Sequence, residues 1–105
     1  MPKLPILFRA ERSGKFKGDV TAVFPTLPAG PGEMTCYAHI GQHSGCTMAW
    51  YSGTRPATPA EYKDLYAELR GRYEDGDDAV TLKPVARITQ AMRDERDTAE
   101  TFSTC

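Results

Sequence analysis

The chain is poor in the residues that usually build a protein core. Leu, Ile, Val and Phe together number only 17 of 105 residues. Such a composition is typical of disorder when the net charge is high, but the net charge here is −1, and Trp50 and five tyrosines add apolar surface to bury. A chain of this length fits one domain. We therefore expect a folded domain over residues 1–90 and a polar, partly disordered tail over residues 91–105.

The chain also lacks long apolar runs. No segment approaches the roughly 20 apolar residues that a membrane-spanning helix needs, so no membrane contact is expected. The apolar start, Met1–Phe8, is too short for a signal sequence and is followed by Arg9 and Glu11. Three cysteines are an odd number, which favours free thiols in a reducing compartment. We expect a cytoplasmic protein.

An excess of one charge is missing as well. Residues 1–57 carry six Lys and Arg against three Asp and Glu, and residues 58–105 carry seven against eleven. Binding to nucleic acid usually requires a clustered basic excess, so this composition disfavours it.

Common catalytic motifs are absent too. The sequence has no phosphate-binding glycine loop, no Gly-x-Ser-x-Gly and no His-Glu-x-x-His. These absences favour a non-enzymatic role and leave open only less familiar catalytic sites.

What the sequence does contain is a set of segments that alternate between apolar and polar residues. This period of two is typical of β-strands. In the first segment Leu4, Ile6, Phe8 and Ala10 share a face. Three prolines and two glycines predict a loop over 25–33. We expect strands over residues 4–11, 17–25, 34–40 and 46–52.

One helix is clearly indicated after the fourth strand. Thr58-Pro-Ala-Glu61 has the residues of a capping box with proline at the first helical position. Apolar residues then recur at helical spacing from Tyr62 to Tyr73. A fifth strand over 79–83 follows. The predicted fold is α+β, with an antiparallel sheet of four to five strands in the order β-β-β-β-α-β and one main helix packed on a face.

The pattern Cys36-x2-His39-x3-His43-x2-Cys46 holds both histidines and two of the three cysteines. Four such ligands could hold zinc. In a regular strand, however, Cys36 and His39 point to opposite faces because they are three residues apart. Two interpretations stay open. His39, His43 and Cys46, with Cys36 as a fourth ligand, could form a metal site, or both cysteines could be small buried side chains.

A basic cluster in the first hairpin is the other candidate site. Arg9, Arg12, Lys15 and Lys17 could contact an anionic partner or a nucleic-acid backbone. The simpler interpretation is a solvated hairpin whose charge is partly offset by Glu11.

Several stretches resemble a group of small uncharacterised proteins from bacterial phage, prophage and other mobile elements. The resemblance covers roughly residues 7–73. It implies an accessory protein that acts on a host component, and it transfers no activity or catalytic residue. The stretches that carry it are Phe8–Ser13, Met34–His43, Trp50-Tyr51 and Arg55–Tyr62.

The function predicted first is a non-enzymatic interaction protein that binds another protein, or a second copy of itself through an exposed sheet edge, without a cofactor. The alternatives are a zinc-binding module at the Cys/His hairpin and a nucleic-acid-binding protein that uses the basic hairpin.

Overall fold

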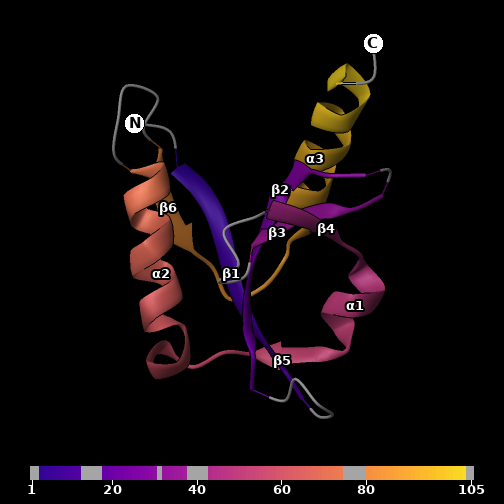
Figure 1. Cartoon of the computed structure of the whole chain (residues 1–105). Coiled ribbons are helices and arrows are strands. Elements are labelled where there is room, and N and C mark those ends of the chain that lie inside the picture. The colour runs from indigo at the N-terminus through magenta and orange to yellow at the C-terminus, as the bar shows by residue number, and fades with distance from the viewer. Residues whose placement is uncertain (1–2, 13–17, 31, 38–42, 75–79, 104–105) are drawn as a thin grey trace.

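The computed structural model describes residues 3–12, 18–30, 32–37, 43–74 and 80–103 of the chain. It confirms the predicted α+β class, with an antiparallel sheet and a helix packed on it (Figure 1). The elements follow the order β1 (Lys3–Glu11), β2 (Val20–Pro28), β3 (Met34–Tyr37), β4 (His43–Cys46), α1 (Met48–Ser52), β5 (Thr54–Pro56), α2 (Pro59–Tyr73), β6 (Thr81–Pro84) and α3 (Gln90–Ser103).

The antiparallel part of the sheet has the strand order β4-β3-β2-β1-β5. Strand β1 shares its second edge between two partners. Its end from Arg9 to Glu11 pairs with β5 in antiparallel fashion, and its start from Lys3 to Ile6 pairs with β6 in parallel. The predicted fifth strand thus exists as β6, but it joins the sheet in the parallel sense because α2 carries the chain back along the sheet before β6 begins.

Helix α2 covers one face of the sheet and builds the first core. The predicted capping box is present, with the Thr58 hydroxyl accepting from the Glu61 N–H and the Glu61 carboxylate accepting from the Thr58 N–H. Leu65 and Leu69 are fully buried. They pack with a set of sheet residues, which are Ile6, Phe8, Ala22, Phe24, Tyr37 and Leu82.

The opposite face of the sheet is also covered, by α1 and α3 (Figure 1). Here the second core consists of buried sheet residues against which Met48, Trp50 and Tyr51 pack. The sequence pattern assigned only one buried face to the first strand, yet Leu7 is buried here while Ile6 and Phe8 are buried in the first core. The sheet members of this core are Leu7, Val23, Met34, Cys36 and Cys46.

The fourth strand was predicted over 46–52, and that prediction is wrong beyond Cys46. Strand β4 ends there, and residues 48–52 form α1. Thr47 caps this helix, since its hydroxyl accepts from the Trp50 N–H at 3.1 Å. The alternation of Cys46, Met48 and Trp50 resembles a strand, but a local cap and packing of the partly buried Trp50 and Tyr51 against the second core favour one helical turn.

The second strand lies three residues later than predicted, with the same length of nine residues. Residues 25–28 were assigned to a loop because of their prolines, but β2 continues to Pro28. The pairing of β2 with β3 shifts between Phe24 and Pro28, so the prolines lie in a bulge where ladder hydrogen bonds are interrupted. The Pro28 carbonyl instead accepts from the Thr35 hydroxyl at 3.1 Å.

Within the part of the chain that the structure describes, no helix is long and apolar enough to cross a membrane. The polar segment after residue 90 contains α3, whose most buried described residue is Arg96. The run Glu74-Asp-Gly76-Asp-Asp predicts a left-handed glycine cap for α2 at Gly76, which lies outside the described residues.

Candidate functional site

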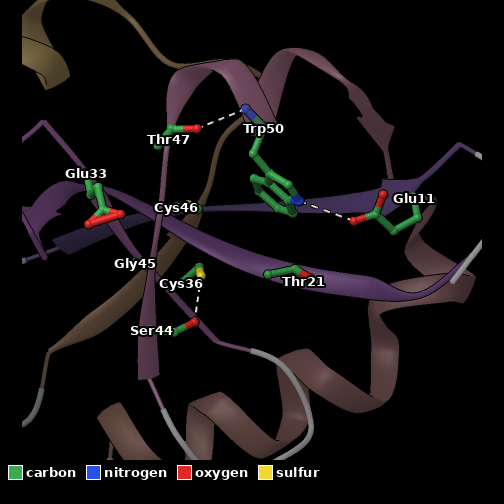
Figure 2. Close-up of a pocket in the computed structure, with 9 residues that line it drawn as sticks. All are labelled: Glu11, Thr21, Glu33, Cys36, Ser44, Gly45, Cys46, Thr47 and Trp50. Atoms are coloured by element: carbon green, nitrogen blue, oxygen red, sulfur yellow. Dashed lines mark hydrogen bonds between the residues drawn. The ribbon is translucent and has the colours of Figure 1, made fainter.

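A pocket of about 370 Å³ opens between the end of the sheet and α1, and we call it the thiol pocket (Figure 2). Strands β1 to β4, the turn before β3 and the start of α1 all contribute to it. Its lining residues are Glu11, Thr21, Glu33, Cys36, Ser44, Gly45, Cys46, Thr47 and Trp50.

Pairing of β3 with β4 brings two cysteines together at the pocket floor. Cys36 lies opposite Ser44, and Cys46 lies opposite Met34, so the two cysteines are diagonal neighbours across the strands. The two side chains are close enough for each to shift the pKa of the other. The Ser44 hydroxyl is 3.2 Å from the Cys36 sulfur (Figure 2). Both cysteines are free and buried in the second core.

The interaction between them makes the two thiols unequal. The Cys46 side chain lowers the pKa of Cys36 to about 6, with help from Ser44, although burial and the Glu33 carboxylate oppose the shift. The Cys36 side chain raises the pKa of Cys46, and burial raises it further. Cys36 is therefore the thiol that ionises first, which makes it the stronger nucleophile.

Acidic side chains surround this thiolate. The Trp50 indole N–H donates to Glu11 Oε1 at 3.2 Å, which holds the ring and the carboxylate at one end of the pocket (Figure 2). Glu33 lies at the other end, next to Gly45. A side chain at position 45 would crowd the Glu33 carboxylate and Ala29. Among the described residues, no Lys or Arg lines the pocket, so its lining is anionic.

The structure brings together only part of the predicted metal site. Cys36 and Cys46 line the same pocket, and His43 is the first residue of β4, paired with Tyr37. His39 lies outside the described residues. Among the residues that are described, no group of three or more His, Cys, Asp and Glu could hold a metal ion.

The basic cluster is divided. Arg9 is buried, and its guanidinium donates to the carbonyl and the hydroxyl of Thr54. Arg9 therefore holds β5 against β1 and is not directed at an anionic partner. Arg12 is exposed, although its Nε also donates to the Thr54 carbonyl at 3.0 Å. Lys15 and Lys17 lie outside the described residues.

Sequence reasoning missed two features of the pocket: the contact of Glu11 with Trp50, and the buried Arg96 near Cys46. Glu11 and Trp50 meet across 39 positions of sequence, and no local pattern indicates this. Arg96 on α3 is only 4% exposed, and its charge acts on the Cys46 thiol. An arginine in a polar helix gives no sequence signal of burial.

Comparisons of the chain with family models, with curated proteins and with solved structures found no match.

Proposed function

We propose that the chain is a non-enzymatic interaction module that adds an extended segment of a partner protein to strand β4. The observation that supports this proposal is the place of β4 at the end of the sheet. It pairs with β3 on one side, and no other strand among the described residues pairs with its second edge. Ser44 and Gly45 are exposed. Unpaired backbone groups at such an edge are a template for a further strand.

The thiol pocket determines which peptide side chains this edge should favour. A strand that pairs with β4 directs every second side chain to the face that carries the pocket. Glu11, Glu33 and the Cys36 thiolate make the lining negative. A Lys or Arg side chain of the partner is complementary in charge and long enough to enter. The partner segment is therefore an extended peptide with a basic residue.

The same charges disfavour the homodimer as the main assembly. Pairing β4 of one chain with β4 of a second copy would bring two acidic pockets to the same interface, where like charges repel. The alternative of nucleic-acid binding is weakened, because the Arg9 guanidinium already donates to Thr54 and is not available for a phosphate.

The experiment is selection of peptides from a displayed random library, followed by affinity measurement with fluorescent synthetic copies. We expect enriched peptides to contain a Lys or Arg, and Glu33→Gln to weaken their binding at least tenfold. Asp64→Asn removes an exposed carboxylate from α2 and serves as the matched control, with unchanged affinity. Absence of any enriched peptide, or equal loss in both variants, would contradict the proposal.

A further inference from the structure

Two cysteines that line the same pocket suggest a chemistry that a peptide-binding edge does not require. Cys36 and Cys46 come from neighbouring strands, point to the same face and both line the thiol pocket. A disulfide requires Cβ atoms about 3.5–4.5 Å apart and a sulfur–sulfur bond of about 2.05 Å. Diagonal neighbours on antiparallel strands are about 7–8 Å apart, so the bond requires a small shift of β4, the end strand of the sheet, toward β3.

The groups around the two cysteines act differently on the two sulfurs. The Ser44 hydroxyl lies 3.2 Å from the Cys36 sulfur, and both Ser44 and Cys46 favour the anionic form of Cys36, while Glu33 opposes it. Arg96 approaches from α3 and favours the anionic form of Cys46. The charges that face the pair are thus Glu33 from the turn before β3, Glu11 from β1 and Arg96 from α3.

Arg96 is the unusual member of this set. It is 4% exposed, and its Nε and Nη1 atoms have no hydrogen-bond partner among the described residues. A buried guanidinium with two nitrogens that lack partners is costly unless a negative charge lies near it. A thiolate that forms at Cys46 during a reaction would supply that charge.

We propose that Cys36 and Cys46 form a redox-active dithiol, which a hydroperoxide oxidises to an intramolecular disulfide between β3 and β4. In the first step the Cys36 thiolate attacks the terminal peroxide oxygen. A sulfur–oxygen bond forms and the oxygen–oxygen bond breaks. The alkoxide, or hydroxide from hydrogen peroxide, takes a proton and leaves as alcohol or water. Cys36 becomes a sulfenic acid.

In the second step Cys46 loses its proton and attacks the Cys36 sulfur. The sulfur–sulfur bond forms, the sulfur–oxygen bond breaks, and the hydroxyl leaves with that proton as water. The two thiols supply two electrons and two hydrogen atoms, and the peroxide is reduced. Arg96 stabilises the Cys46 thiolate that makes this attack. A thiol-containing reductant restores the dithiol by exchange.

The test uses the full chain with Cys105→Ser, so that Cys36 and Cys46 are the only thiols. The purified protein is treated with chelator, then with a small excess of hydrogen peroxide. Intact mass and free thiols are followed. We expect a loss of two hydrogen atoms, a fall from two thiols to none, and reversal by dithiothreitol. Peptide mapping should identify the Cys36–Cys46 link, and this readout needs no further variant.

Variants then separate the two roles. With Cys46→Ser the reaction should stop at a sulfenic acid on Cys36, which dimedone traps. With Cys36→Ser oxidation should slow at least tenfold. Arg96→Lys keeps the charge and should slow disulfide formation less than Arg96→Gln, while sulfenic acid formation changes little in either. Thiols that stay reduced, a sulfinic acid without disulfide, or disulfides only between chains would each overturn the proposal.

Discussion

The guanidinium of Arg9 donates two hydrogen bonds to Thr54. Its Nη2 donates to the Thr54 carbonyl at 2.7 Å, and its Nε donates to the Thr54 hydroxyl at 2.8 Å. The same guanidinium lies 4.3 Å from the centre of the Tyr51 ring. These contacts join β1 to Tyr51 of α1 and to Thr54 at the start of β5. They fix the position of α1 and therefore of Trp50, which lines the thiol pocket.

Replacing Arg9 should therefore destabilise the fold. Arg9→Ala leaves the Thr54 carbonyl with fewer donors in a buried place, and hydrogen bonds from charged groups contribute about 1.5–3 kcal/mol. We expect a loss of about 2–3 kcal/mol in the free energy of unfolding, measured by urea titration. The exposed Arg12→Ala is the control, with a loss of about 0.5 kcal/mol. Equal losses in the two variants would show that burial of Arg9 is unimportant.

A second prediction concerns the pH dependence of Cys36 reactivity. Because Cys46 and Ser44 lower the pKa of Cys36 to about 6, its alkylation by iodoacetamide should reach half its maximal rate near that pH. In Cys46→Ala the midpoint should move upward, since the largest lowering cause is removed. The rates are followed by intact mass in a Cys105→Ser background. A midpoint at about 8.5 in the parent, the value for a free thiol, would contradict the role given to Cys46 and Ser44.

The sequence predicted those parts of the fold that depend on local patterns. The capping box at Thr58 and the apolar spacing of the following residues determine where α2 begins and which face it buries. The alternation in the first and third strands is equally local. Strand parity predicted that Cys36 points into a core, and the structure buries it.

What the sequence could not show depends on partners distant in the chain. The second core exists because α1 and the segment with Val85 and Ile88, just before α3, pack on the other face of the sheet, so Leu7 is buried although its neighbours are buried on the opposite face. The proximity of Cys36 and Cys46 requires the register of β3 against β4. The position of Glu11 in the thiol pocket requires Glu11 of β1 to accept from the Trp50 indole of α1. The origin in phage or other mobile elements stays a prediction.

A third prediction follows from the ion pair at the start of α2. Arg55 donates to both Glu61 oxygens, at 2.8 and 2.6 Å, and with the Thr58 N–H it holds the pKa of Glu61 at about 2, below 4.5. A lowered pKa stabilises the folded state at pH values above 4.5, and that stabilisation disappears as the pH falls from about 4.5 to about 2.

Glu61→Gln should therefore be less stable than the parent at pH 7, and the two proteins should converge near pH 2. Urea unfolding at a series of pH values measures the difference. Glu95→Gln removes an exposed carboxylate from α3 and is the matched control for charge. A difference between parent and Glu61→Gln that is constant with pH would contradict the role of the ion pair.

The fourth prediction compares two exposed glycines. Gly71 lies within α2, where a Cβ would meet nothing within 4 Å. Gly71→Ala should stabilise the protein by about 0.5–1 kcal/mol because glycine is flexible in the unfolded chain. Gly18 also has free space, but its φ of 88° disfavours other residues. Gly18→Ala should destabilise by about 1 kcal/mol. Thermal unfolding measures both, and shifts of the same sign would contradict the argument.

The last prediction tests the helix that replaced a predicted strand. Thr47→Ala removes the hydroxyl that caps α1 and should cost about 1 kcal/mol. Because α1 places the Trp50 indole against Glu11, loss of the cap should also change the fluorescence of Trp50, the only tryptophan in the chain. Thr58→Ala removes the cap of α2 at a similar cost and should leave Trp50 fluorescence unchanged. If residues 48–52 were a strand, Thr47→Ala would alter neither stability nor fluorescence to this extent, because no capping hydrogen bond would exist to lose.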